Sequence, residues 1–227
     1  ERSPGCEGVD TMRQVGLSAL ILVCIGSLAT GQFFAYHDDA CPTCGGSKVF
    51  PFGSAYGNNW RYQFPAPASS LPKQPCRVVD VAFAPSSSGL FSAKDFQLRL
   101  AHTTSLSLSS AFASNFNSPP VTMIDVQNGN YTITARAGVW TTFGGRRPFH
   151  WDGKRHLVIE VRYRGHGTLM QSVPSVTSRT SVRDSHRVWA NDTFPAPGPS
   201  DPYSAKVGYA PQSDSAIKLR LTWVAPV

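Results

Sequence analysis

The chain has 227 residues and a formal net charge of +7, with 19 Gly, 18 Pro and 15% charged residues. An apolar content of 41% excludes a chain that is disordered throughout, and the abundance of Gly and Pro suits a turn-rich sheet protein better than a helical one. The length fits a single large all-β domain.

The first apolar segment has the pattern of an export signal. Met12 and Arg13 form a short basic start, an apolar stretch follows to Leu28, and small residues end it at Gly31. The apolar stretch is shorter than the roughly 20 residues that span a bilayer. We therefore expect residues 1–11 to be upstream read-through, residues 12–31 to be a signal peptide, and contact with a membrane only through an uncleaved signal. The protein is then secreted, either extracellular, periplasmic or retained at the cell surface.

Residues 32–75 are expected to form an irregular N-terminal arm, because Gly, Pro, Ser and aromatic residues occur there without a period. Within this arm, Trp60, Tyr62 and Phe64 alternate and predict a short strand that Pro65 ends. Residues 76–227 are expected to form the β-sandwich domain.

Three cysteines remain after the leader, namely Cys41, Cys44 and Cys76. In an oxidising compartment we expect a disulfide between Cys76 and either Cys41 or Cys44. The alternatives are a redox C-x-x-C pair, although no βαβ pattern surrounds it, and a zinc site completed by His37.

The run His37, Asp38 and Asp39 contains oxygen and imidazole groups that can bind a metal ion. A structural Ca²⁺ is the one cofactor that this composition supports, and an exposed acidic turn is the competing interpretation. No other cofactor is expected.

Period-two alternation of apolar residues predicts strands along the rest of the chain. They lie at residues 77–85, 94–102, 121–127, 130–135, 140–143, 156–164 and 217–223, with further candidates at 188–190 and 205–209. Asn128-Gly129 predicts a type I′ hairpin between two of them, and Asp152-Gly153 predicts a second tight turn. Roughly eight to ten strands with loops of varied length favour an antiparallel two-sheet sandwich of jelly-roll type, with a closed barrel as the alternative.

The order of these motifs resembles a family of uncharacterised secreted bacterial proteins that are common in planctomycete-like genomes. The similar segments are residues 81–85, Phe96 to Thr103, Phe112 with Asn115 and Asn117, and Pro148 to Gly153 leading into residues 157–161. The resemblance covers about residues 56–165. It implies export and a β-sandwich of unknown function.

No specific catalytic motif occurs in the sequence. A G-x-S-x-G elbow is absent, and the six histidines show no H-x-H or H-E-x-x-H spacing. Glycoside hydrolysis needs two carboxylates in a cleft, but Asp152 lies in a predicted turn and Glu160 on the outward face of a strand, where we expect a solvated carboxylate that balances Arg162. An enzyme is therefore less favoured than a binding protein.

Aromatic and basic side chains are the best candidates for ligand binding, because indole rings stack on sugars and arginines attract acidic polymers. The candidates are Trp60, Trp140, Trp151, Trp189, Arg146, Arg147 and Arg155. Core packing is the competing interpretation for the tryptophans, and Trp151 is also placed to staple its own turn. The predicted function is a secreted, non-catalytic β-sandwich that binds glycan, an anionic extracellular polymer or matrix, without specific nucleic-acid binding. A carbohydrate-active enzyme and a subunit of a surface layer or filament are the alternatives, and the sequence leaves the oligomeric state open.

Overall fold

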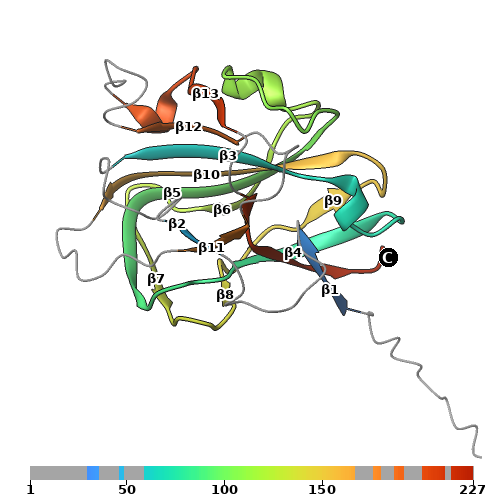
Figure 1. The fold of residues 1–227 in the computed structure, drawn as a ribbon, viewed down its shortest axis with the longest axis horizontal. Coiled ribbons are helices and arrows are strands. Elements are labelled where there is room, and N and C mark those ends of the chain that lie inside the picture. The colour runs from blue at the N-terminus through green and yellow to red at the C-terminus, as the bar shows by residue number, and fades with distance from the viewer. Residues whose placement is uncertain are drawn as a thin grey trace, which may run out of the picture.

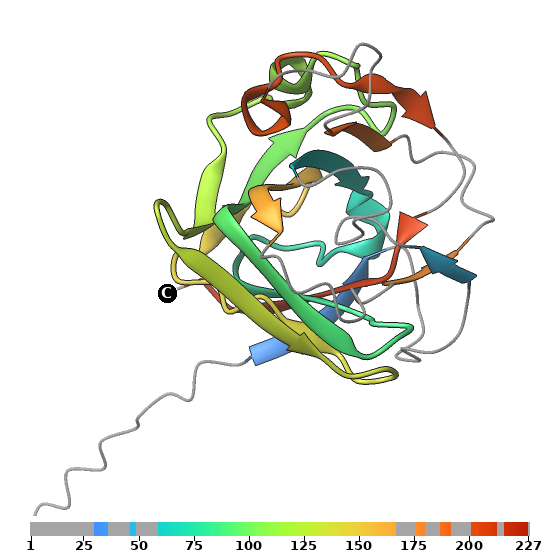
Figure 2. The ribbon, with the colours of Figure 1, turned by 90° about the vertical axis from the view of Figure 1, so that its left-hand side faces the viewer.

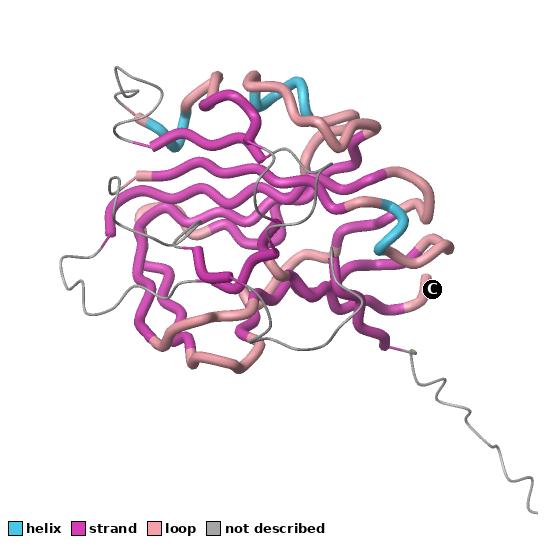
Figure 3. The backbone as a smooth tube through the Cα atoms, viewed as in Figure 1, coloured by secondary structure: helices cyan, strands magenta, loops and turns pink. Residues whose placement is uncertain are grey.

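Strands dominate the computed structural model, which describes residues 30–35, 46–48, 59–166, 176–179, 187–191, 201–212 and 216–226. Figures 1 and 3 show strands and loops with short helical turns between them. In the described residues these turns are the 3-10 helices η1 (Ala68–Ser70), η2 (Phe112–Asn115) and η3 (Pro202–Ser204).

One layer of the molecule is a five-stranded antiparallel sheet, ordered β1-β15-β4-β8, with β9 also paired to β4. Its strands are β1 (Thr30–Ala35), β4 (Cys76–Phe83), β8 (Thr141–Thr142), β9 (Phe149–Trp151) and β15 (Leu219–Val224). The predicted last strand of the chain, β15, is thus central in this sheet, between β1 and β4.

The other layer is a seven-stranded sheet, ordered β13-β12-β3-β10-β5-β6, with β7 also paired to β5. Its strands are β3 (Trp60–Ala66), β5 (Gly89–Thr103), β6 (Val121–Asp125), β7 (Asn130–Ala135), β10 (His156–His166), β12 (Arg187–Asn191) and β13 (Tyr209–Gln212). A third, small sheet joins β14 (Ala216–Ile217), β11 (Val176–Arg179) and β2 (Gly46–Lys48). The predicted all-β, two-sheet antiparallel sandwich is confirmed. The described part has fifteen strands rather than eight to ten, because several are only two to four residues long.

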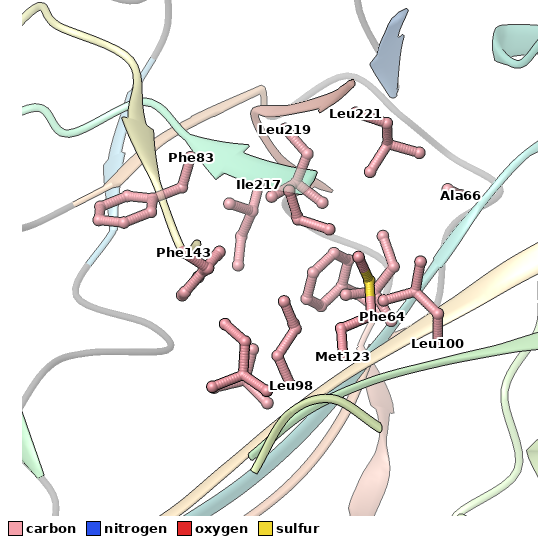
Figure 4. Packing of buried hydrophobic residues seen from close by; sticks show 14 of the residues in the cluster. Phe64, Ala66, Phe83, Leu98, Leu100, Met123, Phe143, Ile217, Leu219 and Leu221 are labelled. Carbon is pink, nitrogen blue, oxygen red and sulfur yellow. The ribbon is translucent and has the colours of Figure 1, made fainter. Parts of the chain in front are cut away.

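The main core lies between the two large sheets and is built from the alternating residues that the sequence predicts to face inward. Figure 4 shows Phe83, Leu219 and Leu221 on one side and Phe64 and Leu98 on the other. All five are at most 4% exposed. Along each strand, every second side chain is therefore apolar and points into a shared interior.

The predicted hairpin at Asn128-Gly129 is wrong. β6 and β7 do not pair with each other; both pair with β5, β6 along its second half and β7 along its first half. Asp95 and Asn128 have φ of 50° and 56°, and the Asn128 backbone N–H donates to the Asp95 carboxylate at 2.7 Å. The dipeptide therefore forms an irregular corner in a continuous ladder, where β5 bends. Figure 1 shows this bend, and Figure 2 shows β7 beside the first half of β5.

The segment before residue 76 contributes integral strands as well as the expected irregular loops. β3 lies between β10 and β12, and all its residues are buried. Pro65 does not end β3, because it lies beyond Gln63, the last residue paired with β12, and faces only Val158 of β10. An irregular arm thus describes this segment only in part.

β1 begins inside the segment assigned to the export signal. Thr30 and Gly31 pair with Val224 and Trp223 of β15, and a Cβ at Gly31 would lie 2.2 Å from Trp223 Nε1. In the structure these two residues thus lie in the folded sheet. Residues 1–29 lie outside the described residues, so the export signal stays a prediction.

Candidate functional site

The structure separates the four candidate tryptophans by exposure. Trp60 and Trp151 are 0% and 2% exposed, so both belong to the core and neither can stack on a ligand. The Trp151 Nε1–H donates to the Arg155 carbonyl at 2.9 Å and so staples the turn at Asp152-Gly153. Trp189 lies in β12 opposite Tyr62, but its side chain lies outside the described part. Trp140 is partly exposed, and it is the candidate that lines a pocket.

The three candidate arginines lie in two different loops. Arg146 and Arg147 are exposed, and their backbone N–H groups donate to the Met123 carbonyl at 2.9 and 3.3 Å. Arg155 Nε donates to Asp152 at 2.6 Å within the turn before β10. Arg146 and Arg147 thus present their charges on the surface, whereas Arg155 stabilises a turn.

The pocket at Trp140, called here the Trp140 groove, has a volume of about 430 Å³ and lies between β7 and β8. In the described part of the chain β7 pairs with β5 and β8 with β4, each at one edge, so the groove lies where edges of the two large sheets approach each other. It is lined by Tyr131, Thr132, Ile133, Thr134, Arg136, Val139, Trp140, Thr141, Thr142, Phe143 and Gly144. Apolar side chains from the core thus meet a row of threonine hydroxyls.

Backbone and ring contacts fix the walls of the Trp140 groove. The Tyr131 ring stacks on Phe96 with centroids 4.0 Å apart, and its hydroxyl donates to the Phe143 carbonyl. Burial raises the pKa of the Tyr131 hydroxyl, so it remains a donor. In the loop between the walls, Gly138 has φ of 74° and donates to the Pro85 carbonyl at 3.0 Å. The segment that carries Trp140 is therefore held by Tyr131 of β7 and by the loop between β4 and β5.

Among the described residues, two arginines and one carboxylate carry the charge at the Trp140 groove, and the carboxylate, Asp80, accepts a hydrogen bond from the lining residue Gly144 at 3.2 Å. Arg136 lines it and is exposed, and the Arg220 guanidinium carbon lies 5.3 Å from the centre of the Trp140 ring. No carboxylate is among the lining residues. The groove therefore combines an aromatic ring, hydroxyl groups and positive charge, a combination that suits polar ligands with an apolar face.

A second cluster, on the outer face of the seven-stranded sheet, is built around Glu160. Glu160 is completely buried and accepts hydrogen bonds from Arg61 Nε at 3.0 Å, Gln63 Nε2 at 2.7 Å and Arg99 Nε at 2.7 Å. Arg162 Nε lies 3.9 Å from the same carboxylate. We call Arg61, Gln63, Arg99, Glu160 and Arg162 the Glu160 network.

A cap formed by residues 104–117 and 201–208 covers the Glu160 network. The two segments are hydrogen-bonded to each other, from Phe112 N–H to the Lys206 carbonyl at 3.1 Å and from Gly208 N–H to the Ser110 carbonyl at 2.8 Å. Aromatic rings of the cap lie against the guanidinium groups, with Phe112 at 4.4 Å from Arg61 and Tyr203 at 4.4 Å from Arg162. In Figure 1 the short helix η2, in green, lies beside β13 at the end of this sheet that β12 and β13 form.

The expected solvated Glu160 is therefore wrong. Alternation correctly predicts that Glu160 points away from the main core, but it cannot show that a cap covers that face. A small second apolar cluster of Leu108, Phe112, Val158, Ala190 and Ala205 seals it. The one available signal is the presence of apolar residues in the loop at 106–116, which an exposed loop would not need.

Asp152 and His102 form the remaining titratable contact near a turn. Burial acts to raise the pKa of Asp152, but hydrogen bonds from the backbone and side chain of Arg155 and from Lys154 N–H outweigh it and lower the pKa. His102 Nε2 lies 3.7 Å from the Asp152 carboxylate. Asp152 therefore acts as an ionised turn residue, as predicted.

The predicted disulfide at Cys76 is not formed. Cys76 is a free, buried thiol, and burial raises its pKa to about 11. Its predicted partners Cys41 and Cys44 lie outside the described residues, as do the metal candidates His37, Asp38 and Asp39. Within the described ranges no three His, Cys, Asp or Glu side chains gather closely enough to hold a metal ion.

No protein-family model, curated protein or solved structure matches this chain. The resemblance to secreted planctomycete-like proteins stays a prediction. Among the residues that the structure describes, no helix is long and apolar enough to cross a bilayer.

Proposed function

We propose that this protein is a secreted or cell-surface β-sandwich without catalytic activity that binds glycans through the Trp140 groove. The observation that carries the proposal is the position of Trp140. Of the four candidate tryptophans, it is the one whose described side chain is partly exposed and lines a pocket.

The chemistry of the lining supports a sugar ligand. The C–H face of a pyranose ring stacks on an indole, and sugar hydroxyls exchange hydrogen bonds with threonine hydroxyls and arginine. Thr132, Thr134 and Thr142 are exposed on the rim, and Arg136 adds a charged donor. A volume of about 430 Å³ has room for a short oligosaccharide segment.

The two carboxylates that sequence patterns raise as glycosidase candidates support binding rather than cleavage. Both oxygens of Glu160 accept hydrogen bonds from arginine and glutamine side chains under the cap. Asp152 is held by Arg155 in a turn. A glycosidase needs one carboxylic acid and one carboxylate that face a shared cleft, and these two residues do not supply that pair.

A glycan array with the purified protein tests the proposal. We expect binding to one or a few related glycans, and we expect Trp140→Ala to weaken it by about tenfold or more, because an aromatic anchor at a binding surface contributes at least about 1.4 kcal/mol. Trp140→Phe should retain most of the affinity, because the stacking ring remains.

Two further outcomes separate the alternatives. Binding that is lost in Arg146→Gln/Arg147→Gln and at moderate salt, but survives Trp140→Ala, would assign recognition to the exposed basic loop and overturn the proposal. Absence of glycan binding together with concentration-dependent self-association would overturn it in favour of a surface-layer or filament subunit.

A further inference from the structure

A smaller pocket of about 230 Å³ lies at the corner where β5 bends. We call it the corner pocket. Besides Asp95, its lining consists of Arg162 and Arg164, the ring of Tyr203, and the amide side chains of Gln97, Gln127 and Asn128. The strained corner itself supplies part of this lining, since Asn128 holds a φ of 56°. Side chains that can each donate hydrogen bonds thus converge on one polar cavity.

The Glu160 network behind this pocket has an excess of positive charge. Three guanidinium groups, those of Arg61, Arg99 and Arg162, surround the single carboxylate of Glu160. Arg61 and Arg99 are hydrogen-bonded to its two oxygens, whereas Arg162 remains 3.9 Å away. Burial lowers the pKa of both Arg61 and Arg162, and the charge of Arg99 adds to this in each case.

Arg162 faces the corner pocket with a guanidinium that has no carboxylate within hydrogen-bond distance in the described part of the chain. Its Nε and Nη2 both donate to Gln97 Oε1, with Nε at 2.7 Å. The side chain is 18% exposed. A guanidinium presents five N–H donors in a planar fork, so an acceptor in the pocket can still be bound.

The carboxylates beside the corner pocket are already engaged. Asp95 and Asp201 bind Arg164 at 3.3 and 2.6 Å. Asp125 accepts hydrogen bonds from Gln97 at 2.6 Å and from Gln127 at 3.1 Å. The pocket and the Glu160 network together thus hold four arginines and four carboxylates, and Arg162 is the arginine among them that has no carboxylate within hydrogen-bond distance in the described residues.

The geometry points to the corner pocket as a binding site for the carboxylate of an acidic sugar, with Arg162 as the main contact. The inference rests on the proposed glycan binding for the class of ligand, but it uses residues outside the Trp140 groove. An anion at Arg162 supplies the carboxylate partner that this guanidinium lacks within hydrogen-bond distance in the described residues, and the exposed amides of Gln127 and Asn128 can donate to its hydroxyls. The volume fits one sugar unit rather than a chain.

Calorimetric titration of the full-length protein with glucuronate, glucose and inorganic sulfate tests the inference. We expect glucuronate to bind and glucose to produce no signal. Arg162→Gln should weaken glucuronate binding by about tenfold or more, because it removes a charge-assisted contact. If sulfate binds as tightly as glucuronate, the site is a general oxyanion site and the assignment to an acidic sugar is overturned.

A second variant guards against misfolding of Arg162→Gln. Asn128→Asp keeps a residue type that tolerates a positive φ and places a negative charge at the pocket mouth, so it should weaken glucuronate binding by about fivefold. Asn130→Asp is the matched control, because it makes the same charge change two residues away at an exposed position outside the pocket lining. Equal effects of both variants would overturn the inference.

The two proposals fail in different ways. If Trp140→Ala abolishes binding on the array and the wild type does not bind glucuronate, the Trp140 groove is supported and the corner pocket is rejected. If glucuronate binding depends on Arg162 and binding on the array does not depend on Trp140, the corner pocket is supported and the Trp140 groove is rejected.

Discussion

His102 connects β5 to the turn between β9 and β10 through a hydrogen bond that depends on protonation. The Asp152 backbone N–H donates to His102 Nε2 at 3.3 Å, which requires a neutral ring at that nitrogen. Burial lowers the pKa of His102; attraction to Asp152 opposes this, and repulsion by Arg155 adds to it. The folded state therefore favours the neutral imidazole.

This pKa shift predicts that stability falls on acidification. A group whose pKa is lower in the folded state gives its full stabilisation above its unfolded pKa, here about 6.5, and loses it as pH falls toward the folded value. Asp152 stays ionised over that range because its pKa is also lowered. We expect the free energy of unfolding, measured in urea from about pH 8 to about pH 5, to decline less in His102→Gln than in the wild type. The same substitution at the exposed His150 is the control. An equal decline in His102→Gln and in the wild type would contradict the prediction.

At the scale of single elements, the sequence predicts strand positions well and strand partners poorly. Alternation identifies β4, β10 and β15, because a half-buried strand must place apolar residues at every second position. Partners depend on contacts that are distant along the chain. Asn128-Gly129 carries the local signature of a hairpin turn, yet the bend of β5 at Asp95 places both flanking strands on β5.

The two predicted turns differ in a way that substitutions can measure. Gly153 has φ of +78°, and a Cβ there would lie 2.7 Å from the Gln74 carbonyl carbon. Gly129 has no positive φ, and its nearest neighbour would be 3.5 Å away. We expect Gly153→Ala to lower the free energy of unfolding by about 2 kcal/mol or more, and Gly129→Ala to change it by about 0.5 kcal/mol or less. Chemical denaturation checks both predictions. A large decrease in the free energy of unfolding in Gly129→Ala would instead support a type I′ hairpin at Asn128-Gly129.

For the whole molecule, composition and alternation indicate the sandwich but not the cap on its outer face. Sequence patterns raise Trp140 as a ligand candidate together with three other tryptophans, and only the fold shows that Trp60 and Trp151 are core residues. The corner pocket could not be predicted either, because Arg162 and Tyr203 come from segments 41 residues apart that the cap brings together. Burial of both faces of the seven-stranded sheet thus depends on contacts between segments that are distant along the chain.

The Glu160 network joins this cap to the sheet, since Arg61 binds Glu160 and also donates to the Ala205 carbonyl, while Gln63 bonds both Glu160 and the Phe112 carbonyl. Removing one partner of a buried ion pair leaves uncompensated charge and typically costs about 3–5 kcal/mol. We therefore expect Glu160→Gln to lower the free energy of unfolding by about that amount. Asp125→Asn, which neutralises an exposed carboxylate, should change it by about 1 kcal/mol or less.

Hydrogen exchange locates where that loss acts. In Glu160→Gln, the amides of residues 104–117 and 201–208 should exchange faster than those of β4 and β15, because the unpaired arginines loosen the cap before the main core opens. Uniform acceleration across both sheets would show instead that cap and sandwich unfold as one unit. A change in unfolding free energy no larger than that of Asp125→Asn would show that Glu160 does not hold the cap at all, and that the apolar cluster around Phe112 is sufficient.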